Sequence, residues 1–362
     1  MKNLITPSIT QDNKRILWLD ILRVLSAFAI VVIHTSTNII DTLAFGSPNW
    51  FSADVYLAAA RYAVPVFVMI SGVFFLNPDK NITIGNIYRK YIFRMLTVLF
   101  FWALVRTLVI DAGFNSVPAS GWAKSFFISI KMFWFLPMII GLYIVTPFIR
   151  PLVKDKKLLQ YFMEASFILA LCVPVMQAVE TQFLPGASFL TDVMTLIKIP
   201  FFIFGAHFVF GYYAYNYDLS KKTKYILYAS AVISVILMSA GTYWFYEDKA
   251  SRFFFYSMHG ASLSPLAFLA GAGVFVFCKD VLGKVKFSAR MSALIHKLAA
   301  YSLGVYLSHI IIVEVLARYG VFKRLDFVSL FIIPLTAGVI FLLANALIAL
   351  IYKIKFVRKY FL

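Results

Sequence analysis

The sequence predicts an all-α, polytopic integral membrane protein, a helical bundle of about ten transmembrane helices. Its 362 residues are 62% hydrophobic and only 14% charged, whereas a soluble protein is about half apolar and about a quarter charged. Apolar segments of about 20 residues, long enough to cross a bilayer, recur along the whole chain. We therefore expect a single transmembrane domain with short loops, in which any chemistry takes place inside the bundle.

The expected domain has three parts: a cytoplasmic tail over residues 1–14, a ten-span bundle over residues 16–351, and a basic cytoplasmic tail over residues 352–362. The ten expected spans are 16–40, 54–76, 87–111, 126–149, 161–180, 193–213, 225–246, 262–278, 299–317 and 328–351. The first apolar segment is interrupted by Asp20 and Arg23, and no clean small-residue cleavage site follows it. We therefore expect this segment to stay in the protein as a helix rather than to be removed as a signal peptide.

The Lys and Arg residues outside the spans predict the orientation. They gather in the N-terminal tail, in every second loop and in the C-terminal tail, whereas the alternate loops hold few. Because basic loops stay on the cytoplasmic side, both termini should be cytoplasmic. The net charge of +18 thus fits an oriented membrane protein that contacts anionic lipid headgroups, and we expect no nucleic-acid partner.

The first span carries three ionisable residues, Asp20, Arg23 and His34. Charged groups at membrane depth are costly, so they are by default candidates for function. Arg23 and His34 are separated by about three helical turns, which leaves them roughly 20° apart around the axis and ~16 Å apart along it. Asp20 lies one turn before Arg23 and can pair with it. The three side chains should therefore face the bundle interior or a wet cavity.

Two further features of the spans bear on packing and charge. In the second span, VPVFVMISGVFF, Pro65 should kink or locally open the helix, while Ser71 and Gly72 should allow close approach of another helix. Basic residues are also expected at membrane depth in later spans: Arg61, Arg106, Lys131 and Lys198. Those near helix ends, notably Arg106, are expected either to extend their charged group to the interface or to have an internal role.

Motifs along the chain resemble those of the acyltransferase-3 family of bacterial membrane acyltransferases. They are Arg23 and His34 within LDILRVLSAFAIVVIH, VPVFVMISG in the second span, the basic start of the third span (YRKYIFRML), FWFLPMIIGLY and its following proline in the fourth, and YSLGVYLSH in the ninth. They occur in family order over nearly the whole chain. The detail of VPVFVMISGVFFLN resembles the branch that includes the enterobacterial common antigen O-acetyltransferase and the staphylococcal polysaccharide succinyltransferase.

The resemblance implies an O-acyltransferase of the bacterial inner membrane. It would move an acyl group, usually acetyl, from cytoplasmic acetyl-CoA or another acyl-CoA to a hydroxyl of an envelope glycan or glycolipid. It also implies that His34 is the main catalytic residue, that Arg23 is its partner, and that His309 matches a family histidine of less certain purpose. His34 can act as a general base or as a transient acyl carrier, and the sequence does not choose between them.

The remaining site residues keep two interpretations each. Arg23 is expected to contact a donor phosphate or amide, or to orient the site through Asp20; the alternative is a structural Arg23–Asp20 pair. The third-span residues Arg89, Lys90 and Arg94 are candidate ligands of the CoA phosphates or ordinary positive-inside anchors. The distance along the helix from Arg23 to His34, ~16 Å, is comparable with the reach of a pantetheine arm.

His309 is expected to be catalytic or a polar core residue beside Tyr306, and Glu314 to partner it or to lie near the outer interface. His207 in a span, and His259 and His296 in loops, show no matching spacing and receive no role. No HExxH motif or acidic–histidine cluster is present, so no metal is expected. The alternative function is a transporter or flippase of a glycan precursor, and a third is a sensor or assembly partner. Buried charges are typical of transporters. Against a transporter, the Arg23/His34 motif is concentrated in one helix.

Overall fold

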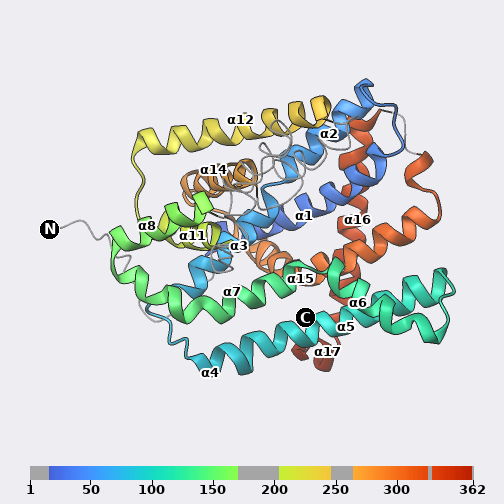
Figure 1. The fold of residues 1–362 in the computed structure, drawn as a ribbon, viewed down its shortest axis with the longest axis horizontal. Coiled ribbons are helices and arrows are strands. Elements are labelled where there is room, and N and C mark those ends of the chain that lie inside the picture. Colours follow the sequence, from blue (N-terminus) through green and yellow to red (C-terminus); the bar gives the residue numbers. More distant parts are fainter. Residues whose placement is uncertain (1–15, 170–203, 246–263, 325–327, 361–362) are drawn as a thin grey trace, which may run out of the picture.

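The computed structural model describes residues 16–169, 204–245, 264–324 and 328–360 (Figure 1). Within these ranges the chain forms helices and no strand, and eight helices are long and apolar enough to cross a membrane. The prediction of an all-α, multi-pass membrane bundle is confirmed. Four of the ten expected spans lie partly outside the described residues: 161–180 and 193–213 over many positions, and 225–246 and 262–278 at one or two positions.

The long helices follow most of the predicted spans. In chain order they are α1 (Leu17–Ile40), α2 (Pro48–Ala60), α3 (Ala63–Phe75), α5 (Phe93–Arg106), α6 (Trp122–Met132), α7 (Phe135–Ile149), α8 (Lys156–Phe167), α11 (Gly205–Asn216), α12 (Lys221–Phe245), α14 (Pro265–Leu282), α15 (Ala289–Arg318) and α16 (Ser329–Ile351). Short helices are α4 (Ile84–Asn86), α17 (Lys355–Tyr360), the π-helical turns Ile87–Ile92 and Thr107–Phe114 on either side of α5, and the 3₁₀ turns Ala119–Gly121, Arg150–Lys154 and Phe322–Arg324.

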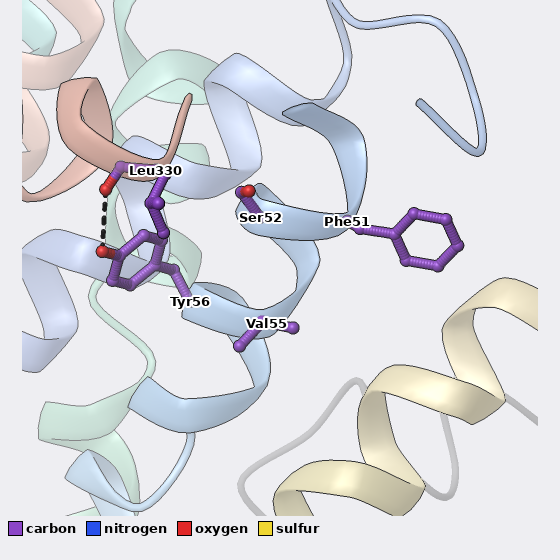
Figure 2. A pocket seen from close by; sticks show the side chains of 5 residues that line it. All are labelled: Phe51, Ser52, Val55, Tyr56 and Leu330. Atoms are coloured by element: carbon purple, nitrogen blue, oxygen red, sulfur yellow. Dashed lines mark hydrogen bonds between the residues drawn. The ribbon is translucent and has the colours of Figure 1, made fainter. Parts of the chain in front are cut away.

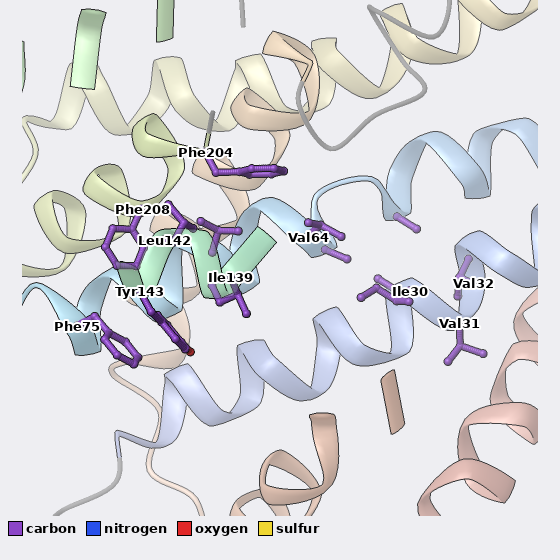
Figure 3. Packing of buried hydrophobic residues seen from close by; sticks show 14 of the residues in the cluster. Ile30, Val31, Val32, Val64, Phe75, Ile139, Leu142, Tyr143, Phe204 and Phe208 are labelled. Atoms are coloured by element: carbon purple, nitrogen blue, oxygen red, sulfur yellow. The ribbon is translucent and has the colours of Figure 1, made fainter. Parts of the chain in front are cut away.

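Helix α1 lies at the centre of the bundle. Figure 1 shows it crossing the middle of the molecule, with α12 along one edge and α4 and α5 along the opposite edge. It packs against α2, α3, α15 and α16. The consecutive residues Ile30, Val31 and Val32 are all buried although they point to different sides of the helix, and Figure 3 shows Val64 of α3 and Ile139 of α7 on the side of Ile30. The helix with the predicted functional residues is therefore the one that the other helices enclose.

Two of the predicted spans are broken into two helices each, a feature that the sequence analysis predicted only in part. Span 54–76 consists of α2 and α3, separated at Arg61–Tyr62, and span 126–149 consists of α6 and α7, separated at Phe133–Trp134. A proline lies four residues after each break, at Pro65 and Pro137. A proline ring clashes with the carbonyl of the residue four positions earlier, so each break occurs where that clash would fall.

The predicted close approach at Gly72 is confirmed. A Cβ atom at Gly72 would collide with the backbone carbonyl of Phe208 on α11, and one at Gly211 of α11 would collide with the backbone of Met69 on α3. The two helices thus pack backbone to backbone, with a glycine of each helix against the backbone of the other, as is common between membrane helices. This contact fixes α3 in place behind the site described next.

Candidate active site

A cavity of about 150 Å³ lies between α1, α3, α5, α7 and α15; we call it the central cavity. Its lining includes Arg23 and Ile30 of α1 and Ser302, Leu303 and Tyr306 of α15. Phe67, Ile70 and Ser71 of α3, Met95 of α5 and Phe135, Ile139 and Tyr143 of α7 complete it. The predicted inward orientation of Arg23 agrees with this placement, because its side chain borders this space between the helices.

At the end of the cavity marked by Arg23, which we call the inner end, Asp20 connects two helices. The Arg23 guanidinium lies 3.3 Å from Asp20 Oδ1, as the spacing predicted. The other oxygen, Oδ2, lies 2.7 Å from Nδ1 of His296. Asp20 is only 4% exposed, and a buried carboxylate requires partners of this kind.

Several basic side chains lie together beside this inner end. The Arg23 guanidinium carbon is 4.9 Å from the ring centre of Phe74, and the Lys80 ammonium is 4.4 Å from the same ring. Desolvation by its surroundings, and then the charge of Arg23, lower the pKa of Lys80. Arg150 donates to the backbone carbonyls of Phe75 and Lys80 at 2.9 and 2.8 Å and so holds the segment that carries Lys80. Positive charge is thus concentrated where an anionic ligand would approach.

The outer end of the central cavity lies one helical turn from two histidines. His34 follows Ile30 on the same face of α1, and His309 follows Tyr306 on α15. The two imidazole rings are 5.2 Å apart between centroids, and the Tyr306 ring is 5.9 Å from that of His309. The structure therefore brings together the two histidines that the sequence singled out, although they lie on helices far apart in the chain.

The tautomer of His309 follows from its contacts. Its Nδ1 lies 3.0 Å from the backbone carbonyl oxygen of Val305, and a carbonyl only accepts hydrogen bonds, so Nδ1 carries a proton. The neutral ring then has its lone pair on Nε2, which is buried and has no hydrogen-bond partner within the described part of the chain. His309 thus presents a proton acceptor beside His34.

A further charged pair lies near the histidines. Arg61, at the break between α2 and α3, is close enough for its charge to act on both His34 and Asp54. Asp54 is fully buried and accepts a hydrogen bond from Ser239 of α12. The break between α2 and α3 thus places a guanidinium near His34. We did not expect this proximity, because the sequence analysis treated 54–76 as a single span.

The three basic residues proposed to bind CoA lie apart from the lining of the central cavity. Arg89 and Lys90 are exposed on the turn before α5, and Arg94 is exposed at its start. Arg94 precedes Met95, which does line the cavity, and the charges of Arg94 and Arg23 both act on Tyr143. Only Arg94 of the three is thus adjacent to the cavity wall.

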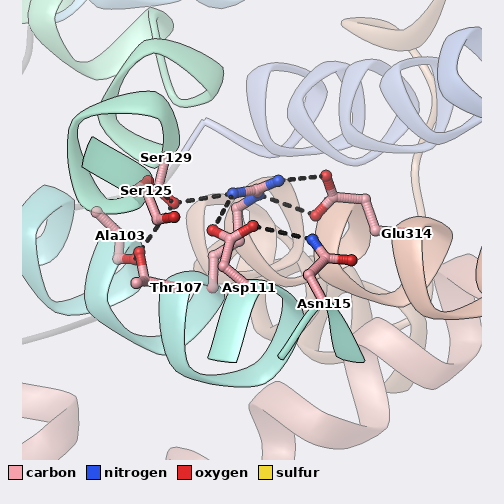
Figure 4. Close-up of polar contacts among 8 residues, drawn as sticks. Ala103, Thr107, Asp111, Asn115, Ser125, Ser129 and Glu314 are labelled. Carbon is pink, nitrogen blue, oxygen red and sulfur yellow. Dashed lines mark hydrogen bonds and ion pairs between the residues drawn. The ribbon is translucent and has the colours of Figure 1, made fainter. Parts of the chain in front are cut away.

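The structure decides between the two alternatives given for Arg106, and it contradicts the expected pairing of Glu314 with His309. Arg106 does not extend to the interface but is 6% exposed, and it donates from Nε and one terminal nitrogen to the two Glu314 oxygens at 2.9 and 2.7 Å. Its other terminal nitrogen donates to Asp111 and Ser129 at 3.1 and 2.9 Å (Figure 4). Glu314 therefore pairs with Arg106 and not with His309. The network joins α5 and α6 to α15.

His296 is the site residue that the sequence analysis missed. It was expected in a loop, but α15 begins at Ala289, capped by the Ser288 side chain, and so includes His296. The sequence does contain a pattern that could have identified it. The interval from His296 to His309 is nearly the same as the interval from Asp20 to His34, so two parallel helices can bring both pairs together. Of the other unassigned residues, His207 is buried against the rings of Phe204 and Phe268, Lys131 is exposed on α6, and Lys198 and His259 lie outside the described residues.

A larger hollow of about 370 Å³ lies between α2 and the start of α16. Figure 2 shows its lining, Phe51, Ser52, Val55, Tyr56 and Leu330, with the Tyr56 hydroxyl donating to the Leu330 carbonyl at 2.8 Å. None of these five side chains is charged, and the two hydroxyl groups, on Ser52 and Tyr56, both donate to backbone carbonyls. The lining thus contains no carboxylate or histidine that could activate either hydroxyl as a nucleophile. Among the described residues, no group of three or more His, Cys, Asp or Glu side chains is arranged to hold a metal ion.

Comparison with protein families decides the class of the protein. The model of a family described as an acyltransferase domain, the acyltransferase-3 family, matches residues 16–353, almost the whole chain. The chain belongs to the acyltransferase-3 family. This membership makes the protein a membrane acyltransferase, with an acyl donor and an acceptor as its substrates. No curated protein and no solved structure matches the chain.

Proposed function

We propose that this acyltransferase moves an acetyl group from cytoplasmic acetyl-CoA to a hydroxyl of an envelope or exported glycan or glycolipid, in the bacterial inner membrane. The observation that carries the proposal is the central cavity, which extends from Arg23 to within one turn of the His34–His309 pair. A slender thioester arm suits such a space, since the axial distance from Arg23 to His34 is ~16 Å.

The donor would be held by charge at the inner end. Arg23 and Lys80, which face one aromatic ring, suit the phosphate or amide groups of CoA, because guanidinium and ammonium groups form charge-assisted hydrogen bonds with phosphate. Arg89, Lys90 and Arg94 would add a positive field at the cytoplasmic mouth. The nucleotide could then stay at this end while only the acetyl group reaches the histidines.

The chemistry would take place at the outer end. The acceptor hydroxyl oxygen attacks the thioester carbonyl carbon while His34 takes the hydroxyl proton as general base. Collapse of the tetrahedral intermediate breaks the carbon–sulfur bond, and the CoA thiolate receives the proton from the imidazolium. In the two-step alternative, His34 first takes the acetyl group, releasing CoA, and then passes it to the hydroxyl. In this two-step route CoA leaves as the thiolate, and Nε2 of His309 would take the acceptor's hydroxyl proton, because an acetylated His34 cannot act as the base.

Thiol release by the purified protein tests this proposal. With acetyl-CoA and candidate glycan acceptors, the wild type should release free CoA thiol only when an acceptor is present, and His34→Ala should abolish the release. His207→Phe is the matched control, because this buried histidine already packs among aromatic rings away from the central cavity. Undiminished turnover in His34→Ala would overturn the assigned chemistry, and a transporter would release no thiol at all.

The same assay can show which acyl-CoA is the preferred donor. Acetyl-CoA and succinyl-CoA offered separately would distinguish the two acyl groups that the related branch suggests. We propose acetyl, because the cavity is small, about 150 Å³, and its walls away from Arg23 are largely apolar. A succinyl group would bring an additional carboxylate into that apolar part at a desolvation cost. Faster turnover with succinyl-CoA would reverse this choice.

A further inference from the structure

Helices α1 and α15 are connected by a polar pair at each end of the central cavity. They pack against each other along their length. Asp20 faces His296 at the inner end, and His34 faces His309 at the outer end. At 1.5 Å per residue the two pairs are separated by ~21 Å along α1 and ~20 Å along α15, so the intervals on the two helices match. A shift of one helix along the other would therefore disrupt both pairs together.

The inner pair differs from the outer pair in being a hydrogen bond between a histidine and a carboxyl group. The Asp20–His296 distance of 2.7 Å is short, whereas the Asp20–Arg23 distance is 3.3 Å. A carboxylate has two oxygens, and here each serves a different partner, His296 from α15 and Arg23 from α1 itself. Holding Oδ2 from the neighbouring helix fixes the plane of the carboxylate, which leaves Oδ1 directed at Arg23.

We infer that His296 is a positioning residue for donor binding: through Asp20 it holds the Arg23 guanidinium at the inner end of the central cavity. The inference rests on the proposed function, in which Arg23 contacts the CoA part of the donor. It also assigns a division of labour between the two ends of α15. His296 acts on donor affinity at the inner end, while His309 lies with His34 at the outer end.

The fixed geometry of the contact predicts which substitutions preserve it. The side-chain nitrogen of Asn occupies about the place of a histidine Nδ1, whereas the longer Gln side chain places its nitrogen near Nε2. Because Nδ1 is the atom that contacts Asp20, His296→Asn should retain the hydrogen bond and His296→Gln should not. His296→Leu removes the polar contact while keeping an apolar side chain of moderate size on α15.

Steady-state kinetics of thiol release tests the inference. We expect His296→Leu and His296→Gln to raise KM for acetyl-CoA about tenfold, as for loss of a hydrogen bond to a charged group, with kcat changed less than about threefold. His296→Asn should stay close to the wild type. Lys297→Leu, an exposed position on the same turn, is the matched control. Equal KM values for His296→Asn and His296→Gln would overturn the inference, whatever the behaviour of His296→Leu.

A second measurement separates positioning from a general loss of structure. In an Arg23→Ala background, His296→Leu should add little to the rise in KM, because the two residues act in one chain of contacts. Equal factors in the two backgrounds would show that His296 does not act through Arg23. If the wild type itself releases no thiol, the proposed function has failed; if the wild type is active and the His296 variants match it, only this inference has failed.

Discussion

The ion-pair network around Arg106 predicts an asymmetric loss of stability. Arg106 donates to two Glu314 oxygens, to Asp111 and to Ser129. Arg106→Met would leave both carboxylates without their cation. Removing one partner of a buried ion pair costs about 3–5 kcal/mol, and this substitution strands two acids. We therefore expect Arg106→Met to be among the most destabilising single substitutions in the bundle.

Replacing one acid should cost less. In Glu314→Gln, the guanidinium keeps Asp111 and Ser129, and the amide oxygen can still accept one hydrogen bond. The loss is then about that of one hydrogen bond to a charged group, about 1.5–3 kcal/mol. Because the Glu314 side chain is 21% exposed, water offsets part of this loss and the lower end of the range is expected.

Thermal unfolding in detergent, followed by tryptophan fluorescence, tests whether Arg106→Met lowers stability more than Glu314→Gln does. Lys131→Met is the control, because Lys131 is an exposed cation on α6 and is not among the hydrogen-bond partners of Arg106, which are Glu314, Asp111 and Ser129. The double variant Arg106→Met/Glu314→Gln should be no less stable than Arg106→Met alone, since the Gln side chain carries no uncompensated charge. Equal losses in Arg106→Met and Glu314→Gln, or a double variant that is the least stable, would refute the reasoning.

Three other predictions follow from the site and its packing. His34→Ala and His309→Ala should each lower kcat by about 10²–10⁴, and the double variant should be little slower than His34→Ala; independent, multiplying losses in a double-mutant cycle would contradict a shared function. Gly72→Ala should lower the unfolding temperature while Gly141→Ala, with open space around its Cβ, should not; the reverse order would count against the tight α3–α11 contact. Because desolvation and Arg23 lower the pKa of Lys80, its neutral amine should be modified faster at mildly alkaline pH than other exposed lysines; an unchanged rate in Arg23→Ala would exclude the contribution of Arg23.

The sequence was sufficient to predict those parts of the fold that depend on local patterns. The first span was expected over 16–40, and α1 covers Leu17–Ile40. The inward orientation of Asp20, Arg23 and His34 follows from helical spacing, because side chains at such intervals must share one face. The same pattern could not show which helix lies opposite that face. The pairing of His34 with His309 is therefore a result of the structure.

The features that the sequence analysis predicted in part or missed depend on details beyond hydropathy. Hydropathy treats 54–76 and 126–149 as continuous; the interruption at Pro65 was expected from the proline, whereas the break four residues before Pro137 was not. His296 was excluded because α15 continues beyond its apolar section, and hydropathy stops at the membrane boundary while the helix does not. Arg106 and Glu314 are 208 residues apart, and no local pattern links them.

Occupation of the central cavity by the donor is the most direct test of the account. Ser71 on α3 and Ser302 on α15 line this cavity, whereas Ser230 on α12 does not line it. In a background with Cys172 and Cys278 replaced by Ala, three variants would each carry a single cysteine, at Ser71, Ser302 or Ser230. The rate at which a small thiol reagent labels that cysteine would then be measured. Acetyl-CoA should slow labelling of Ser71→Cys and Ser302→Cys but leave Ser230→Cys unchanged. Labelling at the two cavity positions that is as fast with saturating acetyl-CoA as without it would contradict a donor bound between Arg23 and His34.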